Sequence, residues 1–253
     1  MQIFAWISAL LIGLSLGLIG GGGSTLTLPV MTYMMGLDKY TATSYSLFIV
    51  GISALFGAFR KYQVGDLDFK IGLLFGIPAA ISLSLTRTFI SPYLPPLFVM
   101  LFFACIMLLA SYSMIKGRKD TEGEENSEPT NYIFLMLMSI VVGVIAGMVG
   151  AGGGFLIIPA LVFFFKTPMK RAVGTSLFII SMQTLFGFTT DVLQGEVNID
   201  WNVLLPFSSL AVIGILLGTY LTKYISAKNL KSGFGYFILI MAIFILAKEL
   251  ILK

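Results

Sequence analysis

The chain has 253 residues, of which 57% are hydrophobic and only 11% are charged. A soluble domain averages about 25% charged residues and cannot cover its surface with so few, so the composition identifies a polytopic membrane protein. The net charge of +4 is small and no basic run is longer than two residues, which argues against a nucleic-acid partner. The chain has no histidine and a single cysteine, so we expect no metal site, no cofactor and no enzymatic activity.

Ten apolar segments follow one another along the chain, five in each half. They are 3–20, 24–36, 43–59, 69–89 and 94–115, then 132–150, 154–165, 173–190, 201–221 and 230–252. Most have the roughly 17 to 25 residues that a spanning helix needs. The second segment of each half has only 13 or 12 residues, and as a helix it would cover about 18 to 20 Å of a hydrocarbon core roughly 30 Å thick. We expect each to begin inside the membrane or to form one arm of a re-entrant hairpin.

The same glycine-rich pattern occurs twice, 130 residues apart. Gly13-x3-Gly17-x2-Gly20-x-Gly22-Gly23 followed by Pro29 reappears as Gly143-x3-Gly147-x2-Gly150-x-Gly152-Gly153 followed by Pro159. Between 13–57 and 143–187, 15 of 45 positions are identical without a gap. The chain is therefore a tandem duplication, and the duplicated unit contains a helix interrupted by glycine inside a bilayer.

A polar stretch separates the two halves. It is rich in acidic residues and has no apolar periodicity, as expected of a solvated linker. The predicted organisation is a first transmembrane repeat at 1–116, a polar linker at 117–130 and a second transmembrane repeat at 131–253.

The distribution of Lys and Arg decides between two topologies. If the first two segments of each half return the chain to its starting side, these residues divide 12 to 4 between the faces; if the first segment crosses and the short one only dips, they divide 8 to 8. The positive-inside rule favours the first arrangement. Its basic face holds Arg60, Lys61, Lys70, Lys116, Arg118, Lys119, Lys166, Lys170, Arg171, Lys223, Lys228 and Lys231, and the other face Lys39, Arg87, Lys248 and Lys253.

This topology gives each half an odd number of crossings, so the second half is inverted relative to the first. The predicted fold is an all-α polytopic membrane protein with two inverted repeats, each with a glycine-broken, hairpin-like helix pair plus three spanning helices. We expect both termini outside, the linker 117–130 in the cytoplasm and the protein in the cell membrane. Superposing 3–115 on 132–252 should require a pseudo-two-fold axis in the membrane plane.

The glycine breaks indicate a binding site made largely of backbone. Glycine permits a tight break and lets a ligand approach the chain closely, and the first N–H groups of the helix after it carry about half a unit of positive charge. Inversion brings both breaks toward the middle, which predicts an anion site there. The predicted substrate-binding residues are Gly20, Gly21, Gly22, Gly23, Ser24, Thr25, Ser44, Ser46, Gly150, Gly152, Gly153, Gly154, Thr175, Ser176 and Gln183.

Gln183 is the only amide in the middle of an otherwise apolar segment, and its counterpart in the first half is Ser53. Other interpretations apply to parts of the pattern. The repeated Gly-x3-Gly spacing is typical of close helix packing. Hydroxyls in membrane helices often bond to their own backbone. The glycines at 150–154 superficially suggest a dinucleotide loop, but no parallel-sheet pattern surrounds them and the P-loop lysine is missing.

The paired motifs resemble the TauE/SafE family of sulfite exporters and related anion transporters. The resemblance rests on the glycine cluster with its proline six residues on, and on Ala172-Val173-Gly174-Thr175-Ser176. The first half has Ala42-Thr43-Ser44-Tyr45-Ser46 instead, a departure from the usual Gly-Thr-Ser. The resemblance implies transport of sulfite, sulfonates or other sulfur-containing anions.

The predicted function is secondary transport of such a small anion across the membrane, most simply export, with the lipid bilayer as the other partner. None of the twelve acidic residues lies in the middle of an apolar run, so an intramembrane proton relay has no candidate. Two alternatives stay open: a channel-like anion facilitator, and ion-coupled uptake of a different small anion.

Overall fold

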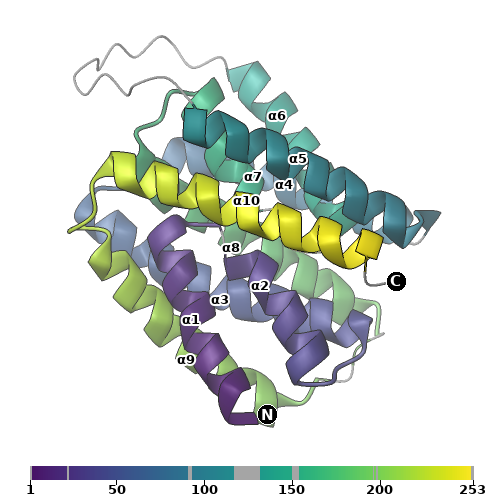
Figure 1. The fold of residues 1–253 in the computed structure, drawn as a ribbon. Coiled ribbons are helices and arrows are strands. Elements are labelled where there is room, and N and C mark those ends of the chain that lie inside the picture. The colour runs from purple at the N-terminus through teal and green to yellow at the C-terminus, as the bar shows by residue number, and fades with distance from the viewer. Residues whose placement is uncertain are drawn as a thin grey trace.

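The computed structural model describes residues 2–21, 23–90, 93–116, 132–149, 154–195, 197 and 199–251. As predicted, the fold is all-α in these parts (Figure 1). The first half contains α1 (Gln2–Ile19), α2 (Gly23–Pro29), the π-helix η1 (Val30–Met34), α3 (Lys39–Val64), α4 (Phe69–Phe89) and α5 (Pro96–Lys116). The second contains α6 (Tyr132–Val149), α7 (Gly154–Pro159), the π-helix η3 (Ala160–Phe164), α8 (Met169–Leu193), α9 (Trp201–Leu221) and α10 (Ala227–Ile251). The predicted linker 117–130 lies outside the described residues.

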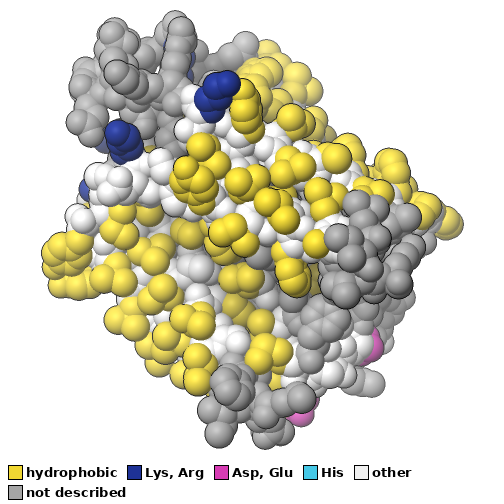
Figure 2. Space-filling model, in the orientation of Figure 1, with side chains coloured by type: hydrophobic (Ala, Val, Ile, Leu, Met, Phe, Trp, Pro, Cys, Tyr) yellow, Lys and Arg dark blue, Asp and Glu magenta, His cyan; other side chains and the backbone are white. Residues whose placement is uncertain are grey.

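Helix length and composition support a multi-pass membrane protein. Within the described ranges, five helices contain stretches long and apolar enough to cross a membrane: Thr41–Val64, Phe69–Phe89, Met169–Leu193, Trp201–Leu221 and Lys228–Ala247. Figure 2 shows hydrophobic side chains over much of the visible face, with Lys and Arg at the upper left and Asp and Glu at the lower right. This separation of an apolar surface from charged ends is what a bilayer requires.

The short second segment of each half is a brief α-helix that widens into a π-helix. The change follows Pro29 in one half and Pro159 in the other. Proline has no N–H to donate and its ring crowds the carbonyl four residues back, so the next turn opens into i→i+5 bonding. Both segments end alike, because the N–H of Leu37 donates to the Met31 carbonyl at 3.2 Å and the N–H of Thr167 to the Leu161 carbonyl at 3.1 Å. Equivalent positions thus adopt the same local structure.

The first two helices form a hairpin. The chain reverses after Gly20, which has a left-handed φ of 76°. A Cβ at Gly23 would lie 2.5 Å from the Ile12 carbonyl oxygen, and further along α1 the Ser8 hydroxyl is 3.6 Å from the Met34 sulfur. The segment after the break therefore runs back along α1 toward its start.

Helices α3 and α8, which occupy equivalent places in the two halves, pack antiparallel at the centre. Ser44 near the start of α3 contacts Asp191 near the end of α8, Gly51 faces Leu185, and Gly57 faces Leu177. We call the two ends of this pair the Asp191 end and the Lys61 end. The spans of α3 and α8 are each 72% buried, compared with 27% for α10, so this pair forms the core of the fold.

The outer helices pair reciprocally between the halves. α1 runs parallel to α9 and α6 runs parallel to α4, and α5 packs on α10. A Cβ at Gly13 would overlap the Ala211 carbonyl, and one at Gly147 would lie 2.6 Å from the Leu83 carbonyl oxygen. The close helix packing predicted from the Gly-x3-Gly spacing is confirmed.

We expect Gly13→Ala to destabilise the protein by about 1 to 3 kcal/mol, because the added methyl would overlap α9 backbone that can move only with its helix. Gly233→Ala in α10 is the matched control, since a Cβ there meets no heavy atom within 4 Å and alanine favours the helix. Thermal unfolding of both variants in detergent makes the comparison. A Gly13→Ala variant as stable as the parent would contradict the tight α1–α9 contact.

Candidate functional site

The turn after α1 and the start of α7 meet beside the middle of α8. A Cβ at Gly154, the first residue of α7, would lie 3.3 Å from the Gly21 Cα and 2.7 Å from a methyl carbon of Ile180. Ser176, Ile180 and Gln183 follow one another at spacings of four and three residues, so they share one face of α8. The start of α7 and the turn after α1 therefore lie along the face that carries Gln183.

Ser176 connects α8 to the first break. Its hydroxyl lies 3.2 Å from the Gly20 carbonyl oxygen and 2.8 Å from that of Val173. A Cβ at Gly20 would lie only 2.8 Å from this hydroxyl oxygen, and the left-handed backbone there already favours glycine. The serine thus satisfies a carbonyl that the break leaves without a helical partner.

Gln183 and Ser53 are buried polar side chains for which no hydrogen-bond partner is found within the described parts of the chain. Both are fully buried, and this holds for the two amide atoms of Gln183 and for the Ser53 hydroxyl. A Cβ at Gly51 would lie 2.8 Å from the Thr184 hydroxyl, so the antiparallel register places Ser53 and Gln183 at the same level of the α3–α8 pair. An unsatisfied buried group costs about 1 to 3 kcal/mol, and such groups in a native fold require an explanation.

Two predicted hydroxyl ligands already have partners inside the protein. Ser44 donates to the Asp191 carboxylate at 2.5 Å, and the Thr175 hydroxyl accepts the backbone N–H of Asp68 at 2.9 Å. Ser46 is buried on α3. The structure thus brings Gly20, Gly21, Gly154, Ser176 and Gln183 together, with Gly23 at the start of α2, whereas Ser44 and Thr175 lie toward opposite ends of the central pair. A role for any of them in ligand binding stays a prediction.

The remaining predicted residues fall outside what the structure describes. These are Gly22, Gly150, Gly152 and Gly153, together with the side chains of Ser24 and Thr25.

Thr175 has a counterpart in the first repeat that is not among the predicted substrate-binding residues. Tyr45 occupies the equivalent position in α3, and its hydroxyl accepts the N–H of Asp200 at 2.6 Å. Asp68 and Asp200 in turn cap α4 and α9, because their carboxylates accept backbone N–H groups of the first helical turn. Each central helix thus anchors the start of a helix from the other half. Matching position 45 with 175 would have revealed this pair.

Two buried charges were also missed, because Asp191 was interpreted only as an acid outside the middle of an apolar run and Lys61 only as a topology signal. Asp191 is 1% exposed and lies 2.8 Å from the Arg87 guanidinium, which is itself 10% exposed. At the other end, the Lys61 ammonium is 2.9 Å from the Thr222 hydroxyl and 3.4 Å from the Asp66 carboxylate. Positions 61 and 191 are equivalent in the two repeats. Opposite charges at one repeat position were the available signal.

We expect Arg87→Leu to lower the free energy of unfolding by about 3 to 5 kcal/mol, because the Asp191 carboxylate stays buried without its cation. The double variant Arg87→Leu/Asp191→Leu should recover much of this loss, since it removes both charges. Thermal unfolding of the purified protein measures both, with the exposed Lys228→Leu as the control for losing one surface cation. A double variant no more stable than the single one would contradict this assignment.

Comparison with known proteins gives a consistent result. The matching family model is described as Sulfite exporter TauE/SafE and covers residues 5–245. A "Probable membrane transporter protein" of Xylella fastidiosa is 27% identical over 242 residues, which is 93% of this chain and 91% of the relative. The "Probable membrane transporter protein YdhB" of Bacillus subtilis is 26% identical over 224 residues, 86% of each chain. No solved structure matches the chain.

Proposed function

The chain belongs to the TauE/SafE sulfite exporter family, and we propose that it is a secondary transporter that exports a small sulfur-containing anion. Sulfite and organosulfonates are the proposed substrates, the plasma membrane is the proposed location, and the binding site lies in the middle of the α3–α8 pair. The membrane-transporter names of the relatives support the general class. The proposed substrate class follows the description of the family, and the proposed outward direction follows from the effect of an inside-negative potential on an anion.

The observation that carries the proposal is the pair of unpartnered donors at the centre of the core. The Gln183 amide has two N–H donors and the Ser53 hydroxyl has one, and none has an acceptor among the described residues. An oxyanion is an acceptor at every oxygen, and charge-assisted hydrogen bonds are roughly twice as strong as neutral ones. The backbone N–H groups of the glycine breaks would add further donors on the same side of α8.

The inverted repeat is part of the proposal, and two arrangements support it. The equivalent helices α3 and α8 run antiparallel, as a two-fold axis perpendicular to them would produce. The pairs α1 with α9 and α6 with α4 are exchanged by the same operation. In such folds a central site can be exposed to either side by movement of one half against the other.

The energetics favour a site made of many weak donors. Removing an ion from water costs several kcal/mol, and a neutral donor returns about 1 to 3 kcal/mol, so several must act together. Export of a monoanion down an inside-negative potential gains about 2.3 kcal/mol per 100 mV. No acidic residue lies in the middle of an apolar segment, and an anion leaving along this gradient needs no coupled proton.

We expect Gln183→Leu to abolish anion binding and transport while raising the stability of the ligand-free protein, because it removes two buried polar atoms that have no partner among the described residues. Purified protein would be screened with sulfite, sulfate, thiosulfate, taurine and sulfoacetate, since a bound ligand raises the unfolding temperature. Uptake into proteoliposomes would then be measured for the ligand that raises the unfolding temperature most. Gln194→Leu is the control, because that amide is exposed at the end of α8.

Loss of binding by about tenfold or more, corresponding to at least about 1.4 kcal/mol, would support the assignment. A Gln183→Leu protein that is less stable and binds normally would overturn it, because the amide would then be structural. Saturable counterflow in proteoliposomes would distinguish the carrier from a channel-like facilitator.

A further inference from the structure

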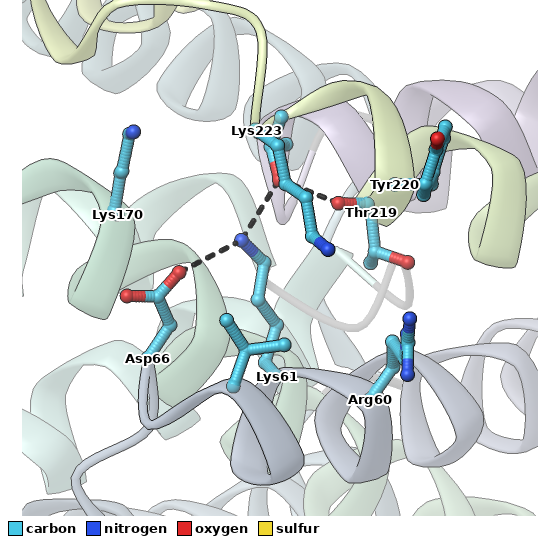
Figure 3. A pocket seen from close by; sticks show the side chains of 9 residues that line it. Arg60, Lys61, Asp66, Lys170, Thr219, Tyr220 and Lys223 are labelled. Carbon is cyan, nitrogen blue, oxygen red and sulfur yellow. Dashed lines mark hydrogen bonds and ion pairs between the residues drawn. The ribbon is translucent and has the colours of Figure 1, made fainter.

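A cationic cavity of about 300 Å³ opens at the Lys61 end of the central pair. The end of α3 supplies Arg60 and Lys61, α8 supplies Lys170, and Lys223 follows α9 (Figure 3). Asp66 is the only carboxylate among its lining residues. Four cations against one acid leave three positive charges around a space large enough for a small ligand.

Lys61 forms the floor of this cavity and is held in place. Its side chain is 5% exposed, and two acceptors, Asp66 and Thr222, contact its ammonium. An ammonium has three N–H donors, so one is available to a ligand in the cavity. The Asp66 carboxylate is partly exposed and compensates the Lys61 charge only in part. The fixed ammonium is therefore preorganised to contact an anion.

The outer cations complete the lining. In Figure 3 the head groups of Lys223 and Arg60 lie to the right of the Lys61 ammonium, whereas Lys170 points away from all three. Lys223 lies 5.6 Å above the Tyr220 ring, which restricts its position.

The neutral donors are already used inside the protein. The Thr222 hydroxyl donates to the Thr219 carbonyl at 2.6 Å, and the Thr219 hydroxyl to the Leu216 carbonyl at 3.0 Å. The ligand is therefore recognised by N–H donors on cations, which suits an oxyanion and offers little to a neutral polar molecule.

We propose that this cavity is an oxyanion-binding site, separate from the central site, that takes a soluble sulfate-like or sulfite-like anion. The site lies over the end of the α3–α8 pair, whose spans are the most buried of the five candidate membrane spans in the described ranges, and so in line with Gln183 and Ser53. Its cations belong to the face predicted to be cytoplasmic. Transfer of the bound anion to the central site rests on the proposed function, whereas binding of the anion in this cavity does not depend on it.

The test uses the reactivity of a cysteine placed in the cavity. Cys105 is exposed on α5, so Cys105→Ser/Val64→Cys leaves one thiol at a lining position. A negatively charged thiosulfonate reagent should modify it about tenfold or more faster than a positively charged one of similar size, because a cationic cavity concentrates anions. Sulfate should slow this reaction when chloride keeps the ionic strength constant, which separates binding from screening.

Arg60→Gln/Lys223→Gln in the same background should remove most of the charge preference and the protection by sulfate. Both side chains are exposed, so the fold should tolerate the change. Cys105→Ser/Val192→Cys is the matched control, because Val192 is similarly exposed, at 41% against 47%, near the Asp191 end; it should show no preference for the negative reagent and no protection.

If sulfate does not slow the modification of the Val64→Cys thiol, the proposal is overturned. This holds whether or not the Arg60→Gln/Lys223→Gln variant folds. Protection by vesicles containing phosphatidylglycerol, but not by sulfate or by phosphatidylcholine vesicles, would identify a lipid headgroup and would also overturn it. Repeating the labelling in Gln183→Leu distinguishes the two proposals. In that variant sulfate should still protect the cysteine, even though transport is lost. If transport is unaffected in that variant, the proposal of a central site is wrong and the proposal of the cavity site stands.

Discussion

Backbone polar groups inside a bilayer must find partners within the protein, because hydrocarbon offers none. A helix break at membrane depth is therefore possible only where other helices enclose it. Gly20, Gly21 and Gly23 are all buried, and α8 contributes the Ser176 hydroxyl to the Gly20 carbonyl. The central position of α8 follows from this need, since a lipid-facing helix could not cover the turn.

Enclosing the breaks imposes a second condition, that helices approach one another very closely. Gly13 and Gly17 admit the α9 backbone, and Gly143 and Gly147 admit α4. Because glycine has no side chain, the backbones of the two helices can come into direct contact at these positions, and such close packing stabilises helix association in lipid. Ser53 and Gln183 are fully buried within this packing. Their polar side-chain atoms have no hydrogen-bond partner among the described residues, and the proposed oxyanion would supply acceptors for their donors.

Much of the fold could be derived from the sequence, because a 130-residue repeat and membrane-length segments are strong signals. The short segments were placed to within two residues, although the π-helices after Pro29 and Pro159 were not foreseen. They arise from local backbone crowding that hydropathy does not record. The convergence of Gly21 and Gly154 was anticipated from the inversion, and the structure brings them into contact.

The side-chain partners were harder to derive. Thr175 and Ser44 are hydroxyls near the motif, and sequence alone cannot distinguish a ligand from a helix-anchoring contact such as Thr175 with Asp68. Asp191 lies at the end of an apolar run, and its cation, Arg87, is 104 residues away in the chain, so the sequence gives no sign that the two residues pair. Long-range pairing of this kind depends on helix register. Comparing equivalent repeat positions shows that 61 and 191 carry opposite charges, but it does not identify the partner of either.

The two ends of the central pair have opposite electrostatic character, and this bears on direction. At the Asp191 end the buried carboxylate is compensated by Arg87. At the Lys61 end four cations surround a cavity with one carboxylate. A focused positive potential raises the local concentration of anions and their rate of entry, so the proposed anion site would capture its ligand more readily at the Lys61 end. If that end faces the cytoplasm, as the distribution of Lys and Arg predicts, the asymmetry would load the proposed carrier from inside, and the membrane potential would drive the anion outward.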